Sequence, residues 1–217
     1  MEMKIKWLYS FKGTEVEFES NWMDKNKILF LINDLERTGR LKQVSIIDQL
    51  GNEWSKKEFM KLDKKLDEEP SDIVVYFDGG YLVDSNEAGI GIAIYYKKNG
   101  ENWRLRTNDK LEQLDSNNEA EYAALYRGIG ALEELGVRNT QVTFKGDSHV
   151  VLKQLAGEWP CFEEGLNRWL DRIEEKIEQL GISPVYQPID RKQNKEADKL
   201  ANQALEETFV NSHAISP

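Results

Sequence analysis

Four acidic residues occupy positions where a folded chain usually avoids a loose charge. Asp78 follows an apolar run and Asp147 follows the segment VTFKG, so both are expected at the ends of strands. Glu121 and Asp198 lie in segments of helical pattern, SNNEAEYAAL and NKEADKLANQ. If the two strands pair in parallel, their carboxylates become neighbours, and the two helical carboxylates can close over the same edge of the sheet. Converging carboxylates repel one another unless a cation binds them.

The chemistry expected of such a cluster is that of hard divalent cations. Carboxylate oxygens favour Mg²⁺ or Mn²⁺ over zinc, for which Cys and His ligands would be expected. The chain has only 2 His and 1 Cys, and they do not cluster. Two ions about 4 Å apart can activate a water and stabilise the leaving oxygen in phosphodiester cleavage. We therefore expect two Mg²⁺ ions per site, with Mn²⁺ able to substitute.

Each of the four residues also has a purely structural explanation. Asp78 and the two glycines after it could form a hairpin turn, which Asp-Gly favours. Asp147 could cap the helix that follows it, and the helix dipole favours Glu121 near a helix N-terminus. Asp198 could be a solvated surface residue. The functional hypothesis depends on all four occurring together, each within its own local motif.

The elements needed to position these residues follow one another along the second part of the chain. The apolar run at 73–77 is typical of a central strand that is buried on both faces. Further strands are expected at 89–96, 103–107, 141–145 and 182–188, and helices at 118–135, 148–155, 163–180 and 194–207. This order predicts an α/β fold in which helices cover a mixed sheet.

The chain divides at a short charged stretch that ends in the helix-breaking Pro70. We expect a small α+β domain at 1–66, a linker at 67–71, a catalytic domain at 72–209 and a tail at 210–217. In the first domain, strands are expected at 4–11, 14–20 and 41–48, and helices at 24–38 and 55–66. The second of these helices carries a stripe of four lysines, at positions 57, 61, 64 and 65. The stripe could track a phosphate backbone, or it could be the solvated face of an amphipathic helix.

Composition limits the setting in which the protein works. Hydrophobic residues make up 40% of the chain, which predicts packed cores rather than disorder. The single Cys161 cannot form an internal disulfide, and no signal peptide or membrane-spanning run is visible, so we expect a cytoplasmic monomer with no membrane partner. The net charge of −10 alone argues against a nucleic-acid binder. Bound cations can nevertheless neutralise carboxylates that face a polyanion.

Four blocks of the sequence resemble the type 1 ribonuclease H family. Together they span about residues 73–205 and occur in the family's order. The blocks are YFDGGYLVDSNEAGIGIAI, SNNEAEYAALYRGIGALEEL, FKGDSHVVLKQL and RKQNKEADKLANQAL. The resemblance implies a ribonuclease H-like fold, a five-stranded mixed sheet flanked by helices, here preceded by the small α+β domain. It also implies hydrolysis of the RNA strand of an RNA–DNA hybrid.

The resemblance further implies a role for each carboxylate. Asp78 would bridge both metal ions, and Asp147 would bind the ion that orients the nucleophilic water. Asp198 would complete the shell of one ion. Glu121 would bind metal and also sense a ribose 2′-hydroxyl, the group that distinguishes RNA from DNA.

Substrate contacts are also implied at positions that match the family's motifs. Positions expected to meet the minor groove or its sugars are Gly79, Gly80, Asn117 and Asn118. Ser116 and Ser148 are candidates for phosphate or sugar contacts, although both could serve as helix caps. Many family members have a histidine in the loop before the last helix, and this chain has none there. Arg191 could act as a cation near the leaving phosphate, or it could be a solvated loop charge.

Two other functions are compatible with this fold. A catalytically silent ribonuclease H-like module could bind nucleic acid or protein, although such a module has no need of clustered negative charge. An enzyme with this fold could also act on a different structured nucleic acid. The segment that contains Asn117, Asn118 and Glu121 favours an enzyme that recognises ribose.

Overall fold

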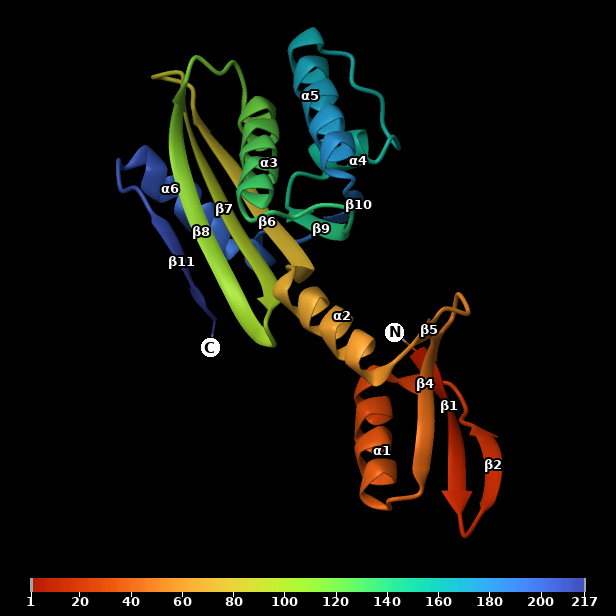
Figure 1. The fold of residues 1–217 in the computed structure, drawn as a ribbon. Helices are drawn as coiled ribbons and strands as arrows, with labels where there is room; N and C mark the ends of the chain where they lie inside the picture. The colour runs from red at the N-terminus through yellow and green to blue at the C-terminus, as the bar shows by residue number, and fades with distance from the viewer. Residues whose placement is uncertain (1, 217) are drawn as a thin grey trace. The chain divides into compact units, whose positions relative to one another are not determined.

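The computed structural model describes residues 2–216, and its contacts separate the chain into two units between Leu66 and Asp67 (Figure 1). The first unit is one sheet with two helices. Its elements are β1 (Glu2–Phe11), β2 (Thr14–Glu19), β3 (Met23–Asp24), α1 (Lys25–Arg37), β4 (Leu41–Asp48), β5 (Glu53–Trp54) and α2 (Lys56–Glu68).

Alternation along β1 gives the first unit its core. Met3 and Ile5 point to the helix side and are fully buried, together with Ile28 and Ile32 of α1 and with Phe59 of α2. The sheet has the strand order β2-β1-β4-β5, and β3 pairs with β1. The expected stripe of four lysines on α2 is exposed. This small α+β architecture is the one expected from the sequence.

The second unit is built on a mixed sheet in the order β10-β9-β6-β7-β8-β11. Strands β10, β9 and β6 run parallel, whereas β6, β7, β8 and β11 pair antiparallel. Its strands are β6 (Ser71–Leu82), β7 (Glu87–Lys98), β8 (Glu101–Glu112), β9 (Gln141–Gly146), β10 (Ser183–Pro188) and β11 (Asn211–Ile215). Its helices are α3 (Asn117–Glu134), α4 (His149–Leu155), α5 (Glu164–Leu180), the 3₁₀ turn η1 (Arg191–Gln193) and α6 (Lys195–Leu205).

Glycines allow helices to lie close against both faces of this sheet (Figure 1). A Cβ on Gly79 would lie 2.3 Å from the backbone carbon of Ala120 in α3. On β7, a Cβ on Gly91 would lie 2.2 Å from the carbonyl oxygen of Ala197 in α6. Gly79 pairs with Ile90, the neighbour of Gly91, so these two glycines face opposite sides. The expected α/β class, with helices covering a mixed sheet, is confirmed.

Two boundaries differ from the sequence prediction. The expected tail at 210–217 contains β11, which adds a sixth strand to the expected five by pairing with β8. The segment NSHAI has no apolar alternation that could have revealed an edge strand. The expected linker at 67–71 is also largely structured, because α2 continues to Glu68 and β6 begins at Ser71.

Candidate active site

Asp78 lies inside a continuous strand and not at a strand end. Strand β6 runs on to Leu82, and Asp78 pairs with Gly91 of β7. The segment that contains Asp78 therefore forms no hairpin turn, and this structural alternative is wrong. The parallel pairing of β6 with β9 ends at Tyr76 and Lys145, two residues before Asp78 and Asp147 respectively. Asp78 and Asp147 therefore both lie just beyond the last residues paired between β6 and β9, at the same edge of the sheet.

Three of the four expected carboxylates meet at this edge. Asp78, Glu121 and Asp147 each offer an oxygen, and these oxygens all lie within 4.8 Å of one another. Asp78 and Glu121 are buried, with 8% and 5% of their surfaces exposed. Glu121 reaches the group from α3, where it accepts a hydrogen bond from the backbone of Gly79. The close approach of α3 to Gly79 therefore places the third carboxylate.

The fourth carboxylate, Asp198, lies in the first turn of α6 and is paired with a cation. Arg191 donates to Asp198 Oδ1 from its Nη2 at 2.9 Å and from its Nε at 3.3 Å. Asp198 is outside the group of three, but its charge acts on Asp78. The Arg191 side chain is 79% exposed, so its guanidinium stays open to solvent while it pairs with Asp198.

The electrostatics of the group are those of crowded, poorly solvated acids. Burial, followed by the charges of Asp147 and Asp198, raises the pKa of Asp78 to about 7. Burial, followed by the charges of Asp78 and Asp147, raises the pKa of Glu121 well above its ordinary range. Among residues 2–216, no hydrogen-bond partner reaches the buried Glu121 Oε2. An unpaired buried carboxylate oxygen is unfavourable unless a further group binds it.

The expected substrate-contact residues are distributed around the start of α3 and the neighbouring strands. Asn117 is exposed and Asn118 is half-buried in the first turn of α3. Ser116 caps this helix and accepts from the backbone N–H of Glu119. Ser148 stands at the N-cap of α4 but makes no capping hydrogen bond with its side chain.

The glycines differ in the space beside them. Gly79 has α3 directly against it, whereas a Cβ on Gly80 would meet only Leu205, at 3.6 Å. Packing against α3 is therefore sufficient to explain why position 79 is glycine.

One residue of this site was missed by the sequence reasoning. Asn194 occupies the N-cap position just before α6 and is 1% exposed. Its side-chain amide donates to both Asp78 and Asp147. Its only signal in the sequence is its position four residues before Asp198, within the last of the four family blocks. An asparagine before a helix is usually explained as a cap, so the pattern alone did not single it out.

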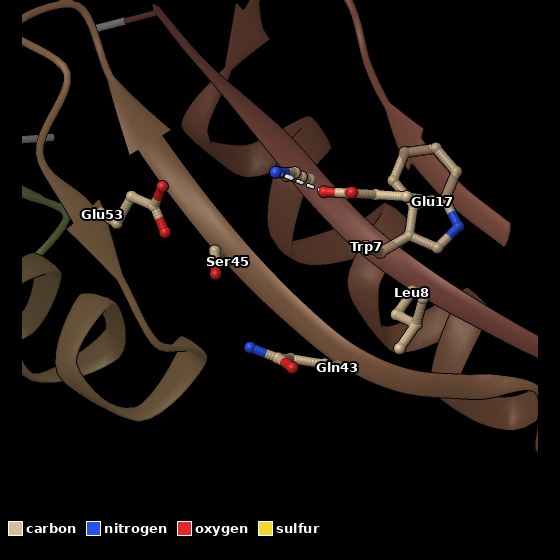
Figure 2. Close-up of a pocket in the computed structure, with 7 residues that line it drawn as sticks. Trp7, Leu8, Glu17, Gln43, Ser45 and Glu53 are labelled. Carbon is tan, nitrogen blue, oxygen red and sulfur yellow. Dashed lines mark ion pairs between the residues drawn. The ribbon is translucent and has the colours of Figure 1, made fainter. Parts of the chain in front are cut away.

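The first unit has a hollow of a different character (Figure 2). It is lined by Lys6, Trp7, Leu8, Glu17, Gln43, Ser45 and Glu53, and Lys6 forms an ion pair there with Glu17. Its two carboxylates come from different strands, β2 and β5, and one of them is already neutralised by a lysine. One carboxylate, Glu53, is left without a lysine among the lining residues, so this hollow does not bring several uncompensated carboxylates together as the Asp78 group does.

Comparison with known proteins agrees with the fold of the second unit. Residues 76–204 match the family described as "Reverse transcriptase-like". The ribonuclease HI of Halobacterium salinarum is 29% identical over 132 residues, covering 61% of this chain and 63% of that protein. The "Uncharacterized protein YpeP" of Bacillus subtilis is 45% identical over 201 residues, covering 93% of this chain and 88% of its own length.

Solved structures of ribonuclease H1 proteins have a fold similar to that of the second unit. The crystal structure of RNase H1 from Halobacterium salinarum covers 62% of this chain and 98% of its own, with a TM-score of 0.54 and 27% identity. LC11-RNase H1 in complex with an RNA/DNA hybrid covers 62% of this chain and 97% of its own, with a TM-score of 0.55 and 27% identity. The second unit therefore has a ribonuclease H-like fold. The chain belongs to the reverse transcriptase-like family. Its similarity to a ribonuclease HI and to ribonuclease H1 structures confirms the resemblance seen in the four sequence blocks.

Proposed function

We propose that this protein is a metal-dependent endonuclease that hydrolyses the RNA strand of RNA–DNA hybrids. The observation that carries the proposal is the meeting of Asp78, Glu121 and Asp147 at one edge of a ribonuclease H-like sheet. The likeness to a ribonuclease H1 that was solved with an RNA/DNA hybrid supports this choice of substrate. Clustered negative charge would only weaken a silent binding module for nucleic acid, so the site favours catalysis over that alternative.

The donor set fits hard divalent cations. All the candidate ligands are carboxylate oxygens, and Glu121 Oε2 is buried without a partner among residues 2–216. Asp78, Glu121, Asp147 and Asp198 would hold two Mg²⁺ or Mn²⁺ ions. Such ions, when bound, supply activation of a water and stabilisation of the leaving oxygen.

The chain's own residues would orient the hybrid around this edge. Asn117 and Asn118, in the first turn of α3, lie on the same element as Glu121 and can meet ribose hydroxyls of the RNA strand. Gly80 and Ser148 are further contact candidates, and Gly79 and Ser116 remain so besides their packing and capping roles. The exposed guanidinium of Arg191 can attract a phosphate while it pairs with Asp198.

We propose that the protein acts as a cytoplasmic monomer. Within residues 2–216, no helix is both long and apolar enough to cross a membrane. Light scattering coupled to size exclusion measures the mass in solution, and a dimer mass would contradict the monomer.

The decisive experiment is incubation of the full chain with an end-labelled RNA–DNA hybrid, with and without Mg²⁺. We expect cleavage of the RNA strand only when the ion is present, and no cleavage of a DNA duplex of the same sequence. Asp78→Asn removes a charge from the centre of the group. Loss of a residue that only hydrogen-bonds to a metal ligand typically costs about 10–100-fold, so loss of the ligand Asp78 itself should lower the rate by more than about 100-fold.

The matched control is Asp84→Asn, which removes one carboxylate from an exposed position beyond the end of β6. This variant should cleave the hybrid like the wild type. Cleavage that persists in EDTA or in Asp78→Asn would contradict the proposal. If metal binds but no hybrid is cut, the silent binding module or a different nucleic-acid substrate becomes the better explanation.

A further inference from the structure

Asn194 forms hydrogen bonds to three of the four acidic residues. Its side chain lies between Asp78 and Asp147, and its backbone contacts Asp198. Its side-chain Nδ2 donates to Asp147 Oδ1 at 3.1 Å and to Asp78 Oδ1 at 3.4 Å. The same amide donates to the carbonyl oxygen of Phe77 at 2.9 Å. The backbone carbonyl oxygen of Asn194 accepts from the backbone N–H of Asp198 at 3.0 Å. One buried residue thus connects β6, the end of β9 and the first turn of α6.

The side chain is not used as an ordinary helix cap. Asn194 occupies the N-cap position of α6, where an asparagine oxygen normally accepts from a backbone N–H of the first turn. Here the side chain makes no capping hydrogen bond. Its Oδ1 is buried and has no hydrogen-bond partner among residues 2–216. The side-chain N–H groups therefore bond to the carboxylates, while the side-chain oxygen has no hydrogen-bond partner among the described residues.

The orientation of this amide follows from charge. Turning it over would place Oδ1 against the oxygens of Asp78 and Asp147, where like partial charges repel. With the N–H groups facing the carboxylates, part of that mutual repulsion is offset. The amide is neutral, so it does not displace a cation from the carboxylates as a lysine or arginine in the same place would.

We propose that Asn194 is a positioning residue that holds Asp78 and Asp147 in their metal-binding arrangement. The proposal rests on the function proposed above, because it assumes that these carboxylates bind divalent ions. Asn194, which is not one of the four carboxylates, would then contribute to the affinity of the site for metal. Residues that hold metal ligands through hydrogen bonds typically contribute about 10–100-fold in affinity.

The test measures Mn²⁺ binding by isothermal titration calorimetry on the full chain, and compares Asn194→Ala and Asn194→Ser with the wild type. Serine is a favoured N-cap residue, but it is too short to reach both carboxylates. If Asn194 only starts the helix, Asn194→Ser should bind Mn²⁺ like the wild type. If Asn194 positions the ligands, both variants should bind Mn²⁺ about tenfold more weakly or worse.

Asn108→Ala is the matched control for the loss of a buried amide. Asn108 is 7% exposed and donates to the carbonyl oxygens of Leu200 and Thr208. Its side-chain oxygen accepts from Val210 N–H, and none of these three partners is one of the carboxylates. Its loss should lower the melting temperature and leave the Mn²⁺ affinity within about twofold. Circular dichroism without metal confirms that each variant is folded.

The outcomes separate this inference from the proposed function. Wild-type affinity in a folded Asn194→Ser overturns the positioning role while hybrid cleavage by the wild type can still stand. Tight Mn²⁺ binding without hybrid cleavage overturns the proposed function and leaves the positioning role to be decided by the affinity ratio. A wild type that binds no Mn²⁺ overturns both. Loss of folding in both Asn194 variants would make the residue structural and overturn the inference.

Discussion

At the scale of single residues, the central feature is the energetic cost of bringing acids together. Asp78 is buried beside Asp147 and within the field of Asp198, and its pKa rises to about 7 in consequence. Asn194 and Arg191 reduce this cost, the first with an amide and the second with a charge on Asp198. A divalent cation bound to the carboxylates would offset the repulsion and the desolvation that remain.

The raised pKa of Asp78 predicts how the metal-free protein responds to pH. The folded state binds the Asp78 proton more tightly than the unfolded state, whose pKa is near 3.8. The stabilising contribution is therefore fully present below that value and is lost as pH rises through about 7. Unfolding in EDTA should show a decline in stability across this window, at most about 4 kcal/mol from this group. Asp78→Asn should flatten the decline, and equal slopes in the two proteins would contradict the pKa.

At the scale of elements, three glycines decide how closely the helices that carry the site lie on the sheet. α3 lies against Gly79, and α6 lies against Gly89 and Gly91. These contacts place Glu121 and Asp198 at the edge where β6 and β9 bring the two other carboxylates. The last strand, β11, is tied to the same unit by Asn108, whose oxygen accepts from Val210 N–H.

Gly91→Ala tests the packing of α6. The added Cβ would lie 2.2 Å from the carbonyl oxygen of Ala197, closer than real Cβ contacts allow, so α6 must shift and carry Asp198 with it. We expect a loss of about 1–3 kcal/mol in unfolding free energy, together with weaker Mn²⁺ binding and slower cleavage. Denaturant unfolding and calorimetry measure the first two effects.

Gly165→Ala, in the first turn of α5, is the control for this substitution, because a Cβ there meets nothing within 4 Å. Alanine is the better helix former, so this variant should be at least as stable as the wild type. If the Gly91→Ala protein is as stable and active as Gly165→Ala, then α6 tolerates a Cβ at position 91 and the predicted displacement of α6 is wrong.

At the scale of the whole molecule, charge is divided unevenly between the two units. Residues 1–66 hold 13 Lys and Arg against 11 Asp and Glu, a net charge of +2. Residues 67–217 hold 16 against 28, a net charge of −12. The unit that carries the carboxylate group is thus the one that repels a polyanion, and the other unit offsets part of that repulsion.

Removing the first unit should therefore affect substrate binding more than the chemical step. Among the described residues 2–66, none belongs to the hydrophobic core of the second unit, so we expect the fragment 67–217 to fold alone. Its kcat for the hybrid should stay near that of the full chain, and its KM should rise by about threefold to tenfold at low salt. Steady-state kinetics at two salt concentrations test this, because screening should shrink the difference. An unchanged KM at low salt would remove any binding role from the first unit.

Much of the fold could be predicted because its signals are local. Two examples are the apolar run before Asp78 and the capping box of Ser55 and Glu58 that begins α2, each of which expresses a preference of a few neighbouring residues. The sixth strand had no such signal, because β11 is an exposed polar segment whose pairing depends on β8, about 100 residues earlier. The pairing of β11 depends on β8 offering an unpaired edge, and that edge exists only once the rest of the sheet has formed.

The sequence by itself determined the four acidic positions, the family and the α/β order of elements, because residue type and short-range periodicity are properties of the chain. Only the tertiary structure decided that β6 continues through Asp78, that Arg191 pairs with Asp198, and that Asn194 joins Asp78 to Asp147. The hydrogen bond between Asn194 and Asp78 spans 116 positions. Contacts of that range exist only after the sheet has brought distant segments to one edge, since no local preference of an asparagine specifies which distant carboxylates it will meet.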